Sequence, residues 1–176
     1  TIHDFGGFPA ELFALRYPAP GSAAIAQEIM QALPQLQLRG DGEQWGLDHG
    51  AWTVLMHLFP QADIPVLQLS LNARADLRAH YQAGQALGCL RERGVLLIGS
   101  GNTVHNFGLM RLPRQHSLWQ QACAFDAQIA HAIDAREHQL LTQFDSPTAL
   151  SLLQAAHPSL EHYAPLLYAA GASRAE

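Results

Sequence analysis

Two short aliphatic segments, with a helical segment between them, constrain the fold of this chain most. Residues 64–71 read IPVLQLSL and residues 95–98 read VLLI, which is typical of strands covered on both faces of a sheet. Residues 75–93 carry Leu and Tyr at near-helical spacing, and Gly94 follows as a C-terminal cap. A strand, a helix and a strand in this order indicate a right-handed parallel crossover.

Further helices are expected on either side of this crossover. They share an apolar stripe together with an N-cap residue or a proline at one end. The expected helices are residues 20–33 with Ser22 as N-cap, residues 48–58 with Asp48 as N-cap, residues 117–144 with room for one break, and two that start at Ser146 and Pro158. The predicted fold is therefore α/β, with helices on both faces of a mostly parallel sheet, in a single domain of residues 1–176.

The composition excludes several classes of protein. With 48% hydrophobic and 14% charged residues among 176, the chain can bury a sizeable core. The net charge of −5, with dispersed basic residues, argues against a nucleic-acid partner. No apolar run approaches the roughly 18–20 residues that span a bilayer, and no signal peptide is evident. Cys89 and Cys123 lack metal-type spacing, so we expect buried free thiols in a cytoplasmic protein.

The segment after the second expected strand is the first candidate for a site. Open α/β sheets bind ligands beyond the carboxyl ends of their strands, and residues 99–106 there read GSGNTVHN. His105 on this loop is placed to act as a general base or a metal ligand. A phosphate-binding loop and a plain turn are the alternatives. The segment lacks a Lys after its glycines and does not match GxGxxG, which argues against phosphate.

Residues 157–163, which read HPSLEHY, form the second candidate. His162 falls near the first turn of the expected last helix, where its imidazole can bind a divalent metal through one nitrogen. Glu161 is expected to face another direction on that helix, so the two should not bind one metal together. A histidine that merely starts a helix is the alternative.

Two further segments combine aromatic rings with titratable groups. Residues 45–52 read WGLDHGAW, so that Asp48 and His49 lie between two tryptophans, and such a wall suits a flat aromatic substrate. A helix N-cap and core packing explain the same residues. The opening segment HDFGGF, with His3 and Asp4, allows the same two interpretations.

Taken together, these segments resemble one family. IHDFGGFP, WGLDHGAW, IPVLQLSL, SGNTVHN and HPSLEHYAPLLY occur in the order and approximate spacing of the class III extradiol ring-cleavage dioxygenases of the 4,5-DOPA dioxygenase type. The resemblance covers about positions 1–171. It implies an α/β fold, a mononuclear non-haem Fe(II) site that Zn(II) can occupy, and insertion of O₂ next to a catechol diol.

The same resemblance implies roles for individual residues. By match to the SGNxVHN motif, His105 is the acid/base residue and, in metal-bound forms, an additional ligand. By match to EHYxPLLY, His162 is a metal ligand. The resemblance also places His49, His3 and Asp4 around the substrate pocket.

The chain departs from the family pattern in two places. The family carries two further metal-ligating histidines ahead of the IHDFGG segment, in HGSP-like and SAHW-like motifs, and a closing strand with a GSLSM-like segment. None of these motifs occurs in residues 1–176. A sheet without its early strands would expose apolar edges. We therefore expect N-terminal strands, a last strand and the remaining metal ligands to lie in parts of a longer protein.

The leading hypothesis is metal-dependent extradiol cleavage of a small catechol with O₂, without a nucleic-acid or membrane partner. Two alternatives stay open. One is a zinc-dependent hydrolase that uses the same pocket, since zinc suits imidazole ligands and activates water. The other is a truncated paralogue that binds a ligand without catalysis.

Overall fold

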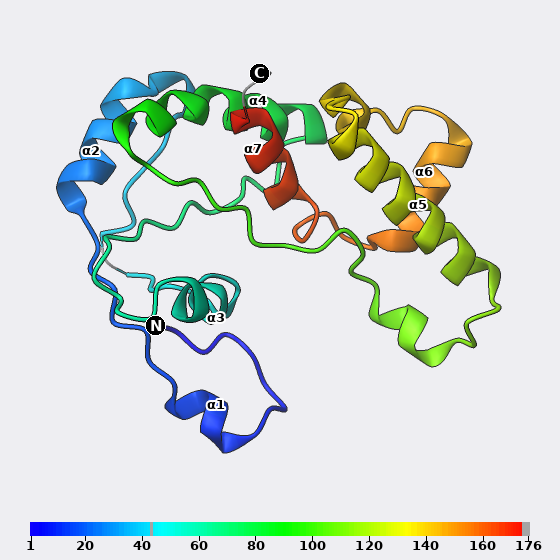
Figure 1. Ribbon diagram of the computed structural model, residues 1–176, viewed down its shortest axis with the longest axis horizontal. Coiled ribbons are helices and arrows are strands. Elements are labelled where there is room, and N and C mark those ends of the chain that lie inside the picture. Colours follow the sequence, from blue (N-terminus) through cyan, green and yellow to red (C-terminus); the bar gives the residue numbers. More distant parts are fainter. Residues whose placement is uncertain (43, 174–176) are drawn as a thin grey trace. The chain divides into compact units, whose positions relative to one another are not determined.

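The computed structural model describes residues 1–42 and 44–173 and divides into two compact units, Thr1–Ser70 (unit 1) and Leu71–Glu176 (unit 2). The described residues form seven α-helices and four short 3₁₀ helices (Figure 1). Unit 1 contains α1 (Ala10–Ala14), α2 (Ala23–Ala32), η1 (Pro34–Leu36) and α3 (His49–Leu58). Unit 2 contains α4 (Leu77–Leu87), η2 (Gly88–Arg93), η3 (Phe107–Arg111), α5 (Ser117–Asp134), η4 (His138–Thr142), α6 (Pro147–Ala156) and α7 (Ala164–Ala172). A single catalytic domain over residues 1–176 stays a prediction.

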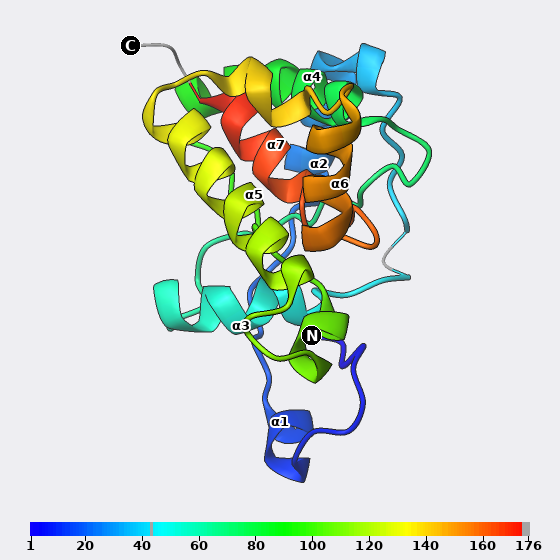
Figure 2. The same ribbon diagram turned by 90° about the vertical axis from the view of Figure 1, so that its right-hand side faces the viewer.

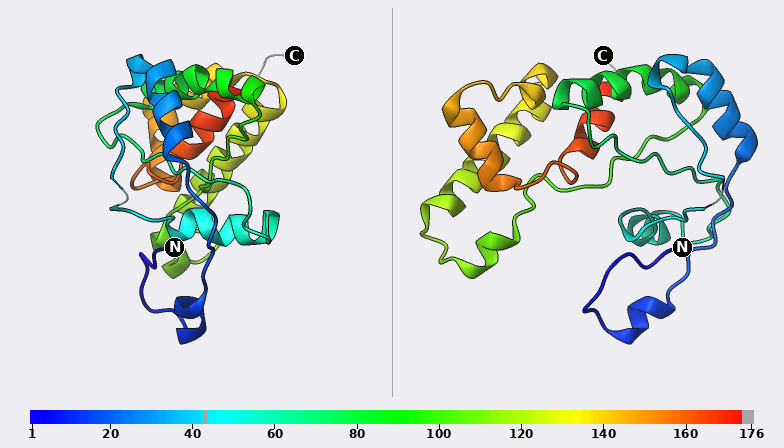
Figure 3. Two further views of the ribbon diagram at one scale, coloured as in Figure 1. Left: turned by 90° about the vertical axis from the view of Figure 1, so that its left-hand side faces the viewer. Right: turned by 180° about the vertical axis from the view of Figure 1, so that it is seen from behind.

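The predicted α/β fold with a mostly parallel sheet is wrong for the described residues. None of residues 1–42 and 44–173 lies in a strand, and residues 64–71 and 95–98 run as coil (Figure 3). A strand needs a ladder of backbone hydrogen bonds to a neighbouring strand. The Val66 amide donates to the carbonyl of Pro20 and the Val95 amide to that of Leu90, but the described residues form no ladder with these segments. Several of their aliphatic side chains stay exposed, Leu96 by 67% and Ile98 by 44%, whereas Val66, Val95 and Leu97 are half-buried. Strand-like composition alone therefore does not produce a sheet here.

The predicted helix starts are confirmed where a side chain caps the helix. The hydroxyl of Ser22 accepts a hydrogen bond from the Ile25 amide and begins α2, and the carboxylate of Asp48 accepts one from the Ala51 amide and begins α3. Ser146 caps α6 in the same way. Each cap satisfies an amide that the first helical turn leaves without a partner.

One helix prediction differs from the structure. The stretch 117–144 has the break that the prediction allowed, since α5 ends at Asp134 and η4 follows at 138–142. The last helix does not start at Pro158 but at Ala164, so residues 157–163 form bends and a turn. This difference affects the site, because Glu161 and His162 lie outside a helix. Helical geometry would point their adjacent side chains in different directions.

Unit 1 has a small aromatic core. Tyr17, Trp52, Leu55 and Ala62 are buried together, with Phe5 and other partly buried residues packed against them. The Tyr17 hydroxyl donates to the carbonyl of Phe59, and the Trp52 indole N–H donates to the carbonyl of Ile2. The opening residues of the chain are thereby fixed to α3.

Unit 2 is a helical assembly in which α4 packs against α7 and α5 against α6 (Figure 2). Its core contains Phe125 and Ile129 of α5, Leu141 and Leu167, all fully buried. Tyr163 is also fully buried there and donates its hydroxyl to the carbonyl of Leu141. Burial raises the pKa of the Tyr163 phenol far above its usual value. Within residues 1–42 and 44–173, no helix combines the length and apolar character needed to cross a membrane.

The contact between α4 and α7 depends on two glycines. A β-carbon at Gly84 would lie 2.4 Å from the carbonyl oxygen of Tyr168, and one at Gly171 would lie 2.2 Å from the carbonyl oxygen of Tyr81.

We expect Gly84→Ala to lower the free energy of unfolding by about 1–3 kcal/mol, the usual cost of overpacking, measured by urea denaturation. Gly88→Ala is the matched control, because its β-carbon would be 3.5 Å from the nearest atom. Equal effects of the two substitutions would contradict the prediction.

Candidate metal and acid–base site

Three side chains that can bind a metal converge in unit 2. His105, Glu161 and His162 each offer a ligand atom, and these atoms lie within 4.8 Å of one another. His105 and His162 are half-buried, whereas Glu161 is exposed. His105 precedes η3, and the other two lie in the turn between α6 and α7. The structure thus brings together the two histidines that the sequence predicted.

Backbone hydrogen bonds hold the two segments against each other. The Asn102 amide donates to the carbonyl of His162 at 2.9 Å, and the His105 amide donates to the carbonyl of Ala156 at 2.9 Å. The side-chain amide of Asn106 donates to the carbonyl of Ala155 at 2.7 Å. The segment 102–106 is therefore fixed to the end of α6 and to the turn that follows it.

The glycines of the GSGN segment allow this close approach. A β-carbon at Gly99 would lie 2.3 Å from the carbonyl oxygen of Pro165, and one at Gly101 would lie 2.3 Å from that of His162. Backbone atoms cannot yield as a flexible side chain can, so both positions require glycine. The glycines therefore serve packing against the turn and α7.

The two imidazoles are stacked. The ring centroids of His105 and His162 are 3.4 Å apart and the ring planes differ by 12°. An imidazole nitrogen binds a metal in the plane of its ring, so two parallel rings cannot both bind one ion without one of them turning. The side-chain NH₂ group of Asn102 lies 3.4 Å from Nδ1 of His162, so Nδ1 is the acceptor in this contact.

Glu161 differs from the sequence-based expectation. It was expected to face away from His162 on a helix, but the turn at 161–163 lets both side chains meet. The Ser159 hydroxyl donates to Glu161 Oε1 at 2.7 Å. This hydrogen bond lowers the pKa of the Glu161 carboxyl, with further lowering from its own backbone amide and from His162 and His105. Glu161 is therefore a carboxylate at neutral pH.

The donor set fits a divalent metal. Two imidazoles and one carboxylate are the ligands that non-haem Fe(II) takes in many oxygenases, and zinc accepts the same types. In the stacked arrangement only one of the two imidazoles can join Glu161 as a ligand of a single ion.

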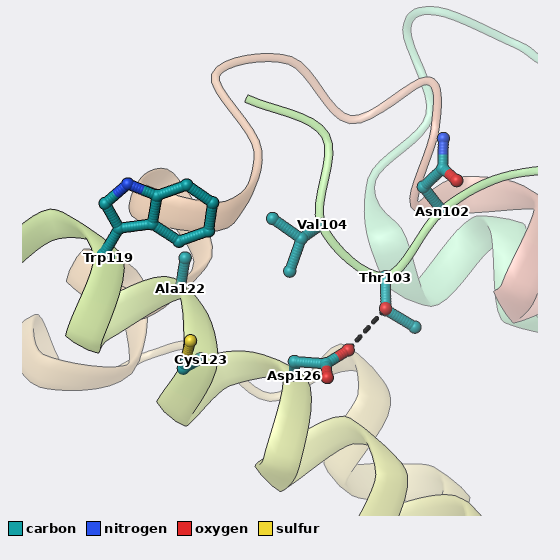
Figure 4. A pocket seen from close by; sticks show the side chains of 7 residues that line it. All are labelled: Asn102, Thr103, Val104, Trp119, Ala122, Cys123 and Asp126. Atoms are coloured by element: carbon teal, nitrogen blue, oxygen red, sulfur yellow. Dashed lines mark hydrogen bonds between the residues drawn. The ribbon is translucent and has the colours of Figure 1, made fainter. Parts of the chain in front are cut away.

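A pocket of about 290 Å³ lies between residues 102–104 and α5 (Figure 4). Its lining consists of Asn102, Thr103, Val104, Trp119, Ala122, Cys123 and Asp126. The Thr103 hydroxyl donates to the carboxylate of Asp126. Sequence reasoning did not identify Trp119 or Asp126, and its expectation of buried thiols is wrong, because Cys123 and Cys89 are exposed free cysteines. Their spacing on α5, which places residues 119, 122, 123 and 126 on one helix face, is the signal that could have found them.

The other predicted residues gather in unit 1. Asp4 Oδ1 accepts a hydrogen bond from the His49 amide at 3.0 Å and from its ring Nδ1 at 2.9 Å. Burial raises the pKa of the Asp4 carboxyl, but the hydrogen bonds from His49 outweigh it, so the pKa lies below its ordinary value. His3 Nε2 lies 3.1 Å from the carbonyl of Leu15. The rings of His3 and His49 both contact Phe5. A substrate-binding role for these residues stays a prediction.

Two buried imidazoles make the stability of unit 2 depend on pH. Burial lowers the pKa of His80 and of His157 below the ordinary 6.5, because a charged imidazolium loses its hydration there. Below about pH 6.5 the unfolded chain therefore binds protons that the folded chain does not. We expect the free energy of unfolding to hold above that pH and to fall as the pH drops toward the lowered folded-state values. Urea titrations at about pH 7.5 and about pH 5.5 measure this difference.

The double variant H80Q/H157Q serves as the control for this pH dependence. It has no imidazole to titrate at either position, so it should lose this part of the fall in stability. A wild-type protein that is equally stable at both pH values would contradict the prediction.

Comparison with known proteins gives consistent matches along the chain. The sequence model of the family described as the catalytic LigB subunit of aromatic ring-opening dioxygenase matches residues 1–175. The 4,5-DOPA dioxygenase extradiol of Escherichia coli K12 is 39% identical over 176 residues, covering 98% of this chain. The protein of the same name from Beta vulgaris is 39% identical over 175 residues, again covering 98%. The chain spans 64% of the length of each of these relatives.

A solved structure supports the same relationship. The crystal structure of an uncharacterized protein from Escherichia coli K12 matches 94% of this chain with a TM-score of 0.71 and 34% sequence identity. The chain covers 68% of that protein.

Proposed function

The chain belongs to the LigB family of aromatic ring-opening dioxygenases, the class III extradiol enzymes, and from this premise we propose that it cleaves a small catechol with O₂ at a divalent metal. The observation that carries the proposal is the convergence of His105, Glu161 and His162 within 4.8 Å. These residues lie on the two segments, SGNTVHN and HPSLEHY, that carry the family resemblance.

We assign different roles to the three residues. His162 and Glu161 are the proposed ligands of non-haem Fe(II), which Zn(II) can replace. A bound Fe(II) would supply neighbouring positions for the catechol diol and for O₂, so that the two reactants meet in one orientation. Asn102 lies against Nδ1 of His162, and its amide would have to turn so that its oxygen accepts from an Nδ1–H when Nε2 binds the metal.

His105 is the proposed acid/base residue. Its ring lies flat against His162, so it is beside the metal ligands without sharing their plane. In this position a neutral imidazole can accept a proton from a catechol hydroxyl and return it to the product. The His105 amide is bound to the carbonyl of Ala156, which limits the movement of the ring.

His49, His3 and Asp4 are the proposed substrate-binding residues of unit 1. Asp4 binds the Nδ1–H of His49, which fixes the tautomer and leaves Nε2 free to accept a hydrogen bond from a ligand. Trp52 and Phe5 lie beside the ring of His3. This combination of aromatic rings with one oriented imidazole suits a flat, hydroxylated substrate.

Oxygen consumption tests the proposal. The protein expressed from its full reading frame is purified without oxygen, reconstituted with Fe(II) and mixed with L-DOPA or simple catechols before O₂ is admitted. We expect O₂ uptake in proportion to substrate, together with a yellow ring-opened semialdehyde. A matched sample loaded with Zn(II) should show neither. Hydrolytic turnover with Zn(II), or metal binding without O₂ uptake, would contradict the proposed function.

A further inference from the structure

The segment that carries His105 is anchored from two sides by residues with no part in the chemistry described above. We propose that His157 is a positioning residue, which holds His105 in place through the backbone carbonyl of Thr103. Asp126 of α5 accepts a hydrogen bond from the hydroxyl of the same threonine. The inference rests on the proposed function, since it takes His105 as the acid/base residue.

The environment of His157 is that of a buried hydrogen-bond donor and not of a group that reacts with substrate. Its side chain is only 2% exposed and packs against the rings of Phe125 and Tyr163. Nε2 lies 2.7 Å from the carbonyl oxygen of Thr103. A carbonyl oxygen only accepts, so Nε2 carries the proton and donates it.

The second ring nitrogen makes the tautomer unambiguous. Nδ1 of His157 is buried and has no hydrogen-bond partner among the described residues. A proton there would leave a buried N–H unsatisfied, at a cost of about 1–3 kcal/mol. Burial also lowers the pKa of this imidazole, which agrees with a neutral ring. His157 is thus a single, fixed hydrogen-bond donor aimed at Thr103.

Thr103 is fixed by both its backbone and its side chain. Its carbonyl accepts from His157, and its hydroxyl donates to Asp126, as the dashed line in Figure 4 shows. The neighbouring Asn102 amide binds the carbonyl of His162. His105 is two residues further along, so a shift of Thr103 passes directly into the His105 backbone.

Displacement of His105 after loss of the His157 hydrogen bond should lower the rate of catalysis by a measurable factor. The rings of His105 and His162 are in contact at 3.4 Å, so a small displacement of one changes its relation to the other. A misplacement of about 1 Å commonly costs about 10²-fold in rate. We therefore expect His157→Leu, which removes the donor, to lower kcat about 10²-fold while KM changes little. His157→Gln keeps an N–H donor and should restore most of the activity.

The decisive measurement does not depend on turnover. Hydrogen exchange of the His105 backbone amide, which donates to Ala156, reports on the anchoring directly. We expect this amide to exchange at least about tenfold faster in H157L than in the wild type, and close to the wild-type rate in H157Q. In the wild-type protein, NMR should show one slowly exchanging Nε2–H proton from His157.

His80 supplies the matched control. It is a histidine of the same unit, 5% exposed, and its Nδ1 lies 3.3 Å from the Tyr168 hydroxyl rather than from the site. H80L should lower stability without changing the exchange of the His105 amide. If H157L proves too unstable to study, D126A removes the other anchor of Thr103 from an exposed position. It should accelerate the same amide by a smaller factor.

These results separate the two proposals. Unchanged exchange of the His105 amide in H157L and D126A, or equal acceleration in H80L, would overturn the anchoring role. A wild-type protein that fails to cleave catechols would contradict the proposed function, while the exchange rates would still decide whether His157 anchors the segment.

Discussion

Replacing His105 by alanine is expected to lower the rate of catechol cleavage by about 10²–10⁴-fold, the usual contribution of a general acid–base group. The ring of His105 is stacked on His162 and has the position of a proton acceptor beside the metal ligands. Without it, the catechol proton must pass to water, which is neither oriented nor held in place. Oxygen uptake with L-DOPA, measured with Fe(II) in excess, gives the change in kcat.

His80→Ala is the control for this substitution. It removes a buried histidine of unit 2 whose ring contacts Tyr168 and not the residues of the site. We expect its kcat to stay within a few-fold of the wild type, even if its free energy of unfolding falls. Equal losses of activity in H105A and H80A would show that the loss comes from folding and would refute the acid/base role of His105.

The sequence predicted local features of the fold better than its architecture. The caps at Ser22, Asp48 and Ser146 are confirmed, because a cap requires only one side chain and an amide three residues away. The strands expected at 64–71 and 95–98 are absent from the described part of the chain. A strand depends on partners far away in sequence, so its aliphatic composition cannot determine by itself whether a sheet forms.

In the candidate site too, residues in local motifs could be predicted, and residues whose roles depend on distant partners could not. His105 and His162 could be found because each lies in a recognisable motif, and the structure brings them together. Glu161 was wrongly expected to diverge, because the helix predicted from Pro158 begins only at Ala164. His157 and Asp126 could not be assigned from sequence. Their roles depend on Thr103, which is 54 and 23 positions away in the chain.

The stacked rings give the two histidines different expected roles, and metal binding separates these roles. We expect His162→Ala to weaken the binding of Zn(II) by at least about 100-fold, beyond the roughly 10–100-fold typical of residues that only support a ligand. The H162A variant lacks the proposed imidazole ligand, and Glu161 with any ligands outside residues 1–176 should bind the ion less tightly. Calorimetric titration at fixed pH measures the change, because protons compete with the metal for imidazole.

His105→Ala is the informative comparison in that titration. If His105 transfers protons and His162 binds the metal, H105A should bind Zn(II) within about tenfold of the wild type while losing turnover. The parallel ring planes, 12° apart, are the reason for expecting this difference, since one ion cannot lie in both planes. A loss of affinity in H105A as large as in H162A would instead make His105 a second ligand. The ring would then have to turn away from His162 when the metal binds, and another group would have to accept the catechol proton.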